Sequence, residues 1–378
     1  MKTHLKRSYD NLQPYIKDGR AIVIYGPRRV GKTTLVRRFL QTQKFRTLEA
    51  IGDDIVVRNL LSSQDRAAIL SWVSGYDALF LDEAQRIPEV GWALKLLIDA
   101  RPELKIIVTG SASFELAGKV GEPLTGRQVP MQLFPLAINE LRTQPMNEHE
   151  LKQKLPEFLV YGMYPEVLTS NTVKQKQFIL QELVSSYLYK DILEIERVKS
   201  AKILSDLLVL LAFQIGKEVS LNELAGQLGI DVKTVARYID LFEKSFVLYN
   251  LRGFSRNLRN EVTSKSKYYF YDTGVRNAVI DNFNPIGMRN DMGELWENFM
   301  VIERLKTRSY ASIPAHDYFW RTWEQKEIDL IEERSGKLYA YEFKWSPKKT
   351  AKVPIVFKEN YPNSEFIVIH QDNFTNIL

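Results

Sequence analysis

The sequence feature that most restricts the fold of this chain is a glycine loop between an apolar run and a helix-like segment. The β-rich run Ala21–Tyr25 is followed by Gly26-Pro27-Arg28-Arg29-Val30-Gly31-Lys32-Thr33, which matches the pattern G-x-x-x-x-G-K-[ST]. In residues 34–40 the apolar side chains recur at helical spacing. Strand, loop and helix therefore follow one another in the order that a phosphate-binding loop requires. This order predicts an α/β domain.

The residues of this loop also predict how a nucleotide is held. Glycines let backbone N–H groups wrap around phosphates, and the N-terminal end of the following helix adds a partial positive charge. We expect the Lys32 ammonium to reach the β- and γ-phosphates and the Thr33 hydroxyl to bind Mg²⁺. A chance glycine turn is the alternative, but it would not explain the strand before the loop and the helix after it. The pattern predicts a P-loop NTPase domain with ATP and Mg²⁺ as its cofactors.

A second motif of this kind is an acidic pair at the end of another apolar run. Residues 78–81 read Ala-Leu-Phe-Leu, as in a buried parallel strand, and Asp82 and Glu83 follow. We expect Asp82 to hold Mg²⁺ at the carboxyl end of the strand and Glu83 to polarise the attacking water. Solvated turns also carry such pairs, but after a P-loop the catalytic interpretation is favoured. The predicted nucleotide-binding residues are Gly26, Pro27, Arg28, Arg29, Val30, Gly31, Lys32, Thr33, Thr34 and Asp82.

Polar residues beyond the acidic pair are further candidates for the same site. The next apolar run ends in Thr109-Gly110-Ser111, and either hydroxyl could sense the γ-phosphate or simply end a strand. Arg127 is a candidate for stabilising charge in the transition state, and Arg28 and Arg29 compete for that role. An ordinary surface position is the alternative for each arginine.

Length and composition bound what else the chain contains. Its 378 residues predict two or three domains. The absence of cysteine excludes disulfides and thiolate zinc sites, and it fits a reducing cytoplasm. No apolar run is long enough to span a bilayer, so we expect a cytoplasmic protein without a membrane segment. The net charge of +6 fits a solvated basic face plus a nucleotide pocket, and supports a nucleic-acid surface only weakly.

The middle of the chain has a helix-turn-helix pattern. Ser220 can cap a helix, Gly229 can end it, and Asp231 can cap a second helix. The second helix would present four side chains outward: Lys233, Thr234, Arg237 and Tyr238. Residues 246–251 and 267–271 are strand-like, as in a wing, and arginines follow the first of them: Arg252, Arg256 and Arg259. The pattern indicates a winged helix that either binds duplex DNA or only packs, and the weakly basic second helix slightly favours packing.

Near the C-terminus, acidic residues and a lysine are spaced as in a divalent-metal site. Glu342 and Lys344 lie two apart, so they share one face of a strand. Asp329 belongs to the preceding strand-like run, and Glu297 to an earlier helix-like one. The carboxylates could hold Mg²⁺ or Mn²⁺ while Lys344 orients or activates a water for phosphodiester attack. A surface ion pair between Lys344 and Glu342 is the alternative.

Taken together, several segments resemble one known family. They are GPRRVGKTTL at 26–35, LFLDEAQ at 79–85, IIVTGSAS at 106–113, LTGRQVPMQLFPL at 124–136, YGMYPEV at 161–167, YLYKDIL at 187–193, TVARYIDLFEKSFV at 234–247, KYYFYDTG at 267–274, GELWENF at 293–299, KEIDLI and YEFKW. Over nearly its whole length the chain is similar to prokaryotic ATPases that join an AAA-type P-loop domain to a domain of unknown function, DUF4143.

The resemblance implies an α/β fold built from several domains. These are an AAA-type P-loop ATPase domain with a parallel sheet at 1–140, a helical lid or linker at 141–205, a winged helix at 206–256 with wing strands extending to about 274, and a restriction-endonuclease-like domain of the PD-(D/E)xK type at 257–378. It places Arg127 near the nucleotide and matches Lys32, Asp82 and Glu83 to the ATPase positions. The residues that match the nuclease positions are Glu297, Asp329, Glu342 and Lys344, with Ile328 where the name-motif has proline.

Two functions follow from these motifs. The first is an ATPase that regulates a C-terminal, metal-dependent nuclease acting on DNA, which the intact set of Asp329, Glu342 and Lys344 favours. The alternative is an ATP-driven signalling switch whose C-terminal domain is a non-catalytic binding module, which the modest basic charge favours mildly. A helicase or translocase is a weaker hypothesis, because no additional motor domain follows. The partners to test are ATP, DNA and a second copy of the chain.

Overall fold

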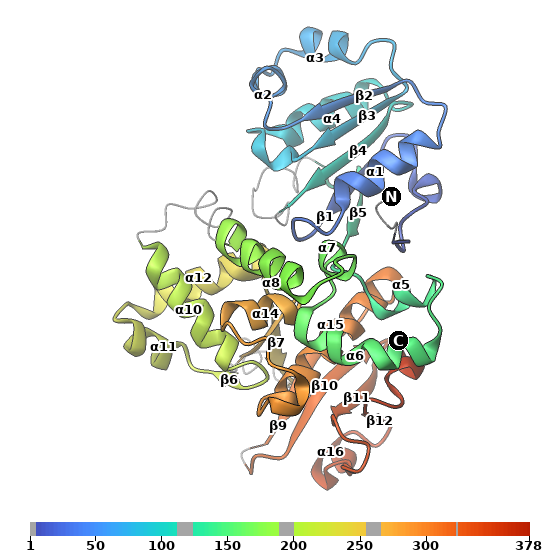
Figure 1. Ribbon diagram of the computed structural model, residues 1–378. Coiled ribbons are helices and arrows are strands. Elements are labelled where there is room, and N and C mark those ends of the chain that lie inside the picture. The colour runs from blue at the N-terminus through green and yellow to red at the C-terminus, as the bar shows by residue number, and fades with distance from the viewer. Residues whose placement is uncertain (1–4, 112–123, 189–199, 255–265, 323) are drawn as a thin grey trace. The chain divides into compact units, whose positions relative to one another are not determined.

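The computed structural model describes residues 5–111, 124–188, 200–254, 266–322 and 324–378 (Figure 1). The chain forms two compact units, one of residues 6–135 with 244–246, and the other of the remaining chain. Each unit has a β-sheet of its own. Because residues 136–378 group almost entirely as one unit, the boundaries at 205/206 and 256/257 remain predictions.

The N-terminal unit is built on a five-stranded sheet whose neighbouring strands are all parallel, in the order β2-β3-β4-β1-β5. Its central strands are apolar and buried, as expected where helices cover both faces of a sheet. The parallel α/β fold predicted for this region is confirmed. The strands are β1 (Ala21–Tyr25), β2 (Thr47–Ile51), β3 (Ala78–Asp82), β4 (Lys105–Gly110) and β5 (Gln128–Gln132).

Helices of this unit begin at residues suited to capping. Asp54 and Asp65 each accept a hydrogen bond from a backbone N–H in the first turn of the helix that follows. The helices are α1 (Lys32–Gln41), α2 (Ile55–Ser62), α3 (Arg66–Trp72) and α4 (Val90–Ala100), with 3-10 turns η1 (Gln13–Tyr15) and η2 (Ala84–Arg86). The first helix, α1, begins directly at Lys32 of the glycine loop, as the sequence predicts.

The second unit contains a seven-stranded sheet in the order β12-β11-β10-β9-β7-β8-β6. The strands are β6 (Glu218–Val219), β7 (Leu248–Gly253), β8 (Ser266–Phe270), β9 (His316–Arg321), β10 (Glu327–Arg334), β11 (Lys337–Phe343) and β12 (Glu365–Ile369). The expected hairpin is present, because β10 and β11 pair antiparallel up to Arg334 and Lys337. The expected wing strands β7 and β8 also pair antiparallel, and β7 joins β9, so both belong to the same sheet as the C-terminal strands.

The long helix α15 contributes several buried residues to the main hydrophobic cluster of this unit. Trp296 of α15 is fully buried and meets Phe299, Trp345 and Phe374 edge-on or stacked. The helices are α5 (Ile138–Arg142), α6 (Glu148–Tyr161), α7 (Pro165–Leu168), α8 (Val173–Glu182), α10 (Ala201–Phe213), α11 (Leu221–Leu228), α12 (Val232–Lys244), α14 (Thr273–Val279), α15 (Met292–Tyr310) and α16 (Ile355–Asn360), with a π-helix η4 (Leu183–Leu188) and 3-10 turns η5 (Ile286–Met288) and η6 (Phe374–Ile377). Within the described ranges no helix is long and apolar enough to cross a membrane.

The predicted helix-turn-helix pair is present as α11 and α12. Ser220 and Asp231 accept hydrogen bonds from the backbone N–H groups of Glu223 and Thr234, and Gly229 ends α11 in a left-handed conformation. The outward orientation expected for Tyr238 is wrong, since only 2% of this residue is exposed. It lies on the buried face of α12, with Val235 three residues before it and Phe242 four residues after it. Arg256 and Arg259 lie outside the described residues, and Arg252 is exposed on β7.

Candidate functional site

The glycine loop lies at the carboxyl end of β1 and is shaped by close backbone contacts. Gly26 has φ 141°, and a Cβ there would lie 2.0 Å from the carbonyl oxygen of Leu133. Lys32 is buried, and its Nζ donates hydrogen bonds of 2.8 Å to the carbonyl oxygens of Gly26 and Pro27. The lysine ammonium is thus held inside the curve of the loop. An anion within this curve would meet the ammonium and the first N–H groups of α1 together.

Side chains from β3, β4 and α1 meet beside the loop. The Thr33 hydroxyl lies 2.9 and 3.1 Å from the two carboxylate oxygens of Asp82, which ends β3. Thr109 near the end of β4 donates its hydroxyl to the same carboxylate, and accepts a 3.4 Å hydrogen bond from the backbone N–H of Glu83. A hydroxyl and a carboxylate in contact at a P-loop are the donor set that Mg²⁺ takes from the protein in such sites. These residues therefore fit Mg²⁺ bound with a nucleotide.

Glu83 is oriented by a residue that the sequence analysis did not assign. The Gln85 amide donates to the Glu83 carboxylate at 2.5 Å and to the Ser111 hydroxyl at 2.9 Å. Glu83 itself has φ 52°, which turns the chain sharply after β3. Gln85 thus joins the predicted water-polarising acid to Ser111, and Thr109 contacts Asp82. Both hydroxyl candidates lie at the site, although only their strand positions, and not these contacts, were predictable.

The three candidate arginines are placed differently. Arg28 and Arg29 lie in the loop, half-buried and exposed respectively. Arg127 forms a 2.7 Å ion pair with Asp99 and immediately precedes β5, whose first residue pairs with Ala21 at the start of β1. The loop follows the other end of β1, and a strand of this length separates its ends by roughly 15 Å. The structure therefore does not bring Arg127 to the glycine loop of its own chain.

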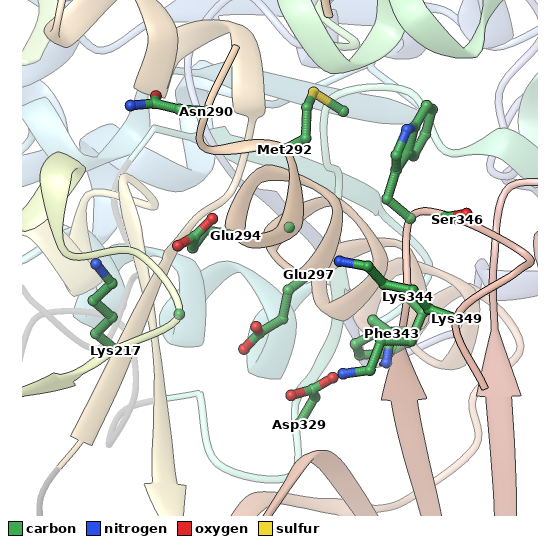
Figure 2. A pocket seen from close by; sticks show the side chains of 13 residues that line it. Lys217, Asn290, Met292, Glu294, Glu297, Asp329, Phe343, Lys344, Ser346 and Lys349 are labelled. Atoms are coloured by element: carbon green, nitrogen blue, oxygen red, sulfur yellow. The ribbon is translucent and has the colours of Figure 1, made fainter. Parts of the chain in front are cut away.

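The second candidate site is a pocket of about 520 Å³ in the C-terminal unit. Its lining includes the predicted residues Glu297, Asp329 and Lys344 (Figure 2). Figure 2 shows the carboxylates of Glu297 and Asp329 directed toward one another, with Lys344 reaching over from the end of β11. Lysines also stand at the rim, namely Lys217 and Lys349. The sequence prediction that an acid from α15, an acid from β10 and Lys344 share one site is consistent with this pocket.

The acids of this pocket are held by specific partners. The Glu297 carboxylate accepts hydrogen bonds from the Tyr269 hydroxyl at 2.6 Å and from Lys267 Nζ at 3.1 Å. Asp329 accepts a 2.7 Å hydrogen bond from the backbone N–H of Phe343. Burial raises the pKa of Glu297, although the charge of Lys267 opposes the rise. Burial, followed by the charges of Glu297 and Glu342, raises the pKa of Asp329 well above its usual range.

Glu342 is turned to a different partner. It pairs with Lys344 at 2.5 Å and does not line the pocket. Burial disfavours the charge of Lys344, but the hydrogen bond to Glu342 and the charge of Asp329 outweigh it and raise the pKa of Lys344. Among the described residues, no group of three or more His, Asp or Glu side chains could hold a metal ion. The predicted metal set of Glu297, Asp329 and Glu342 is thus not assembled, because Lys267 engages Glu297 and Lys344 engages Glu342.

Comparisons with known protein families match three successive parts of the chain. Residues 18–142 match the family described as an AAA domain. The match supports an AAA-type P-loop domain. Residues 152–285 and 292–376 match two domains of unknown function, DUF8612 and DUF4143. These descriptions name neither a winged helix nor a nuclease, so both assignments remain predictions.

Two relatives of known sequence are described as uncharacterized proteins. A protein of Mycobacterium tuberculosis is 28% identical, with 85% of this chain and 70% of the relative covered. A protein of Haemophilus influenzae is 24% identical, with 94% of this chain and 88% of the relative covered. The solved structure of the Thermotoga maritima RuvB Holliday junction branch migration motor is 19% identical with a TM-score of 0.30, covering 61% of this chain and 81% of that chain. A score this low does not establish a shared function.

The segments YGMYPEV and KYYFYDTG also meet one another away from the two sites, at Asp272. Asp272 accepts hydrogen bonds from the backbone N–H groups of Met163 at 2.6 Å and Val275 at 3.1 Å. Gly162 passes so close that a Cβ there would lie 2.0 Å from an oxygen of Asp272. The segments YGMYPEV and KYYFYDTG therefore fix α14 against the end of α6.

Proposed function

We propose that the chain binds Mg·ATP at the glycine loop and hydrolyses it. The observation that carries this proposal is the contact between the Thr33 hydroxyl and the Asp82 carboxylate, next to an ammonium held within the loop. Random glycine turns do not bring a hydroxyl at the start of a helix onto the acid that ends a neighbouring strand. The match of residues 18–142 to an AAA domain supports the same conclusion.

Each residue of the site has a distinct role in this proposal. The Lys32 ammonium leaves the carbonyl oxygens of the loop and binds the β- and γ-phosphates, while the N–H groups of the loop surround them. Thr33 and Asp82 hold Mg²⁺, which neutralises charge on the phosphates. Glu83 accepts a hydrogen bond from the attacking water and polarises it, and Gln85 keeps the Glu83 carboxylate turned toward Ser111.

Arg127 fits this scheme only through a second copy of the chain. It lies at the opposite end of β1 from the loop, so it cannot stabilise charge on a nucleotide bound to its own chain. Self-association would have to bring Arg127 of one chain to the loop of the next. In that case hydrolysis per chain rises with protein concentration, whereas an Arg127 that only pairs with Asp99 gives a constant rate.

The second candidate function is metal-dependent cleavage of DNA by the C-terminal unit under control of ATP. The observation that favours it is the shared pocket of Asp329, Glu297 and Lys344, in which buried acids lie beside a lysine. The residues fit a divalent cation only in part, because Glu297 and Glu342 each have a lysine partner. Asp329 would be the main ligand, and Lys344 would orient the water. A non-catalytic binding module coupled to ATP is the alternative, and the lysine pairs favour it.

One assay of the full chain separates these possibilities. ATP hydrolysis and cleavage of linear and circular DNA are measured together, with Mg²⁺, with Mn²⁺ and in EDTA. Hydrolysis that is lost in Lys32→Ala supports the ATPase, and an intact chain without any hydrolysis refutes it. Cleavage that is lost in Asp329→Asn and persists in Lys349→Ala supports the nuclease. Hydrolysis without cleavage favours the binding module.

A further inference from the structure

Glu297 of the acidic pocket contacts a buried lysine to which the sequence analysis assigned no role. Lys267 on β8 is 1% exposed, and its Nζ lies 3.1 Å from a carboxylate oxygen of Glu297. The same nitrogen also donates to the carboxylate of Glu327 at the start of β10. The ring of Phe319 lies beneath it, 5.4 Å from the nitrogen to the ring centroid. A lysine this deeply buried keeps its charge only where acids surround it, and the charges of Glu297, Glu327 and Asp329 together raise the pKa of Lys267 against its burial.

Two side chains of β8 hold the Glu297 carboxylate. Tyr269, two residues beyond Lys267 and therefore on the same face of β8, donates its hydroxyl to the oxygen that Lys267 contacts. Gly216 also lies close to this carboxylate, since a Cβ there would be 3.2 Å from the other carboxylate oxygen. Turning the Glu297 carboxylate toward a metal ion would therefore break its hydrogen bonds to Lys267 and Tyr269.

We infer that Lys267 is the built-in counter-cation of the C-terminal pocket and competes with divalent cations for it. The ammonium occupies the position between Glu297 and Glu327 in which a metal would otherwise neutralise two carboxylates. Lys267 is thus a positioning residue that holds Glu297 and keeps the affinity of the pocket for cations low. This inference concerns the pocket of the second candidate function, but it does not require DNA cleavage.

The charges around the pocket give the direction of the effect. When Lys267 loses its charge, Lys344 is the remaining ammonium near Glu297 and Asp329 among the predicted site residues. Glu327 keeps its ion pair with Arg321 at 3.6 Å. Three carboxylates without their shared ammonium repel one another, and a divalent cation relieves that repulsion. The repulsion between Lys267 and such a cation is also removed. Both changes strengthen cation binding. For charges a few ångströms apart, the affinity should rise by roughly tenfold or more.

The test is Mn²⁺ binding to the full chain, measured by the electron paramagnetic resonance of free Mn²⁺ in the absence of nucleotide. All proteins carry Asp82→Asn, so that the glycine-loop site does not contribute. We expect Lys267→Met and Lys267→Gln to bind Mn²⁺ at least about tenfold more tightly than the parent. Lys267→Arg, which keeps the charge, should bind as the parent does. Lys349→Met removes a lysine from the exposed rim of the same pocket and should change the affinity less than threefold, since exposed charges are screened.

Two further measurements keep the result decisive. Adding Glu297→Gln to Lys267→Met should abolish the gain in affinity, because it removes the acid that Lys267 releases. If Lys267→Met is unfolded in EDTA, refolding on addition of Mn²⁺ supports the inference. Failure to refold at saturating Mn²⁺, or folded Met and Gln variants that bind no more tightly than the parent, overturns it. If the Lys267→Met variant binds Mn²⁺ and the parent does not, the result supports the inference. It then refutes only the metal-dependent nuclease.

Discussion

The sharpest structural prediction concerns Gly26, where one added methyl group meets the backbone. In Gly26→Ala the new Cβ would lie 2.0 Å from the Leu133 oxygen and 3.0 Å from the Leu133 carbonyl carbon. Both partners are main-chain atoms, so relief requires the glycine loop or the chain after β5 to move by about 1 Å. The φ of 141° adds strain for alanine. Overpacking and backbone strain each cost about 1–3 kcal/mol.

The displaced loop should lose nucleotide affinity by more than this strain alone suggests. A hydrogen bond to a charged group contributes about 1.5–3 kcal/mol, so loss of two bonds to phosphate weakens binding by about 100-fold or more. The assay is titration of a fluorescent ATP analogue with Mg²⁺ present. Gly19→Ala is the matched control, because Gly19 also has a positive φ of 72° but a Cβ there meets nothing within 4 Å. An affinity of Gly26→Ala within threefold of the parent would refute the reasoning.

Three more outcomes are expected. Glu83→Gln should bind Mg·ATP as tightly as the parent but hydrolyse it about 100- to 10,000-fold more slowly, since a general base contributes this much; equal rates in a coupled phosphate-release assay would contradict its role. Arg127→Ala should lower the turnover of the self-associated protein only. In the parent, hydrolysis per chain should therefore rise at the protein concentrations at which light scattering shows association. A variant that is slower than the parent even where the chain is monomeric would exclude the role between chains. Burial, followed by the charge of Glu332, raises the pKa of Tyr341 from 10.0 to about 12. The folded state therefore keeps the proton to higher pH than the unfolded state, and the protein loses stability as the pH rises between these values. Tyr341→Phe should make thermal unfolding less sensitive to pH over that range, and an unchanged dependence would assign the loss of stability to other groups.

Much of the nucleotide site was predictable because its determinants are local. The residues from β1 through Thr33 are contiguous, and the acids follow directly after a second buried strand. A parallel sheet brings the carboxyl ends of neighbouring strands to one edge, which places Asp82 beside Thr33 without further information. Gln85 was part of a quoted motif, but its bridge between Glu83 and Ser111 depends on the turn at Glu83 and could not be inferred from spacing.

The C-terminal pocket was less predictable because its partners come from distant segments. Strand alternation predicted that Glu342 and Lys344 share one face. Their side chains do lie together, although Lys344 follows the last residue of β11, but spacing could not show that they form an ion pair. Lys267 precedes Glu297 by 30 residues and reaches it only because β8 joins the same sheet as β9 and β10 through β7. The position of Arg127 was unpredictable for a similar reason, because the sequence does not show at which end of the sheet β5 begins. Its role in hydrolysis stays a prediction.

Binding of Mg·ATP by the glycine loop can be measured by isothermal titration calorimetry of the full chain with ATP in excess Mg²⁺, with Lys32→Ala as the matched variant. We expect saturable binding at one nucleotide per chain. Removal of the positive charge of Lys32, which binds the phosphates, should lower the affinity by about 10- to 100-fold. A folded chain that releases no heat with ATP, or a Lys32→Ala variant that binds as the parent does, would contradict the account.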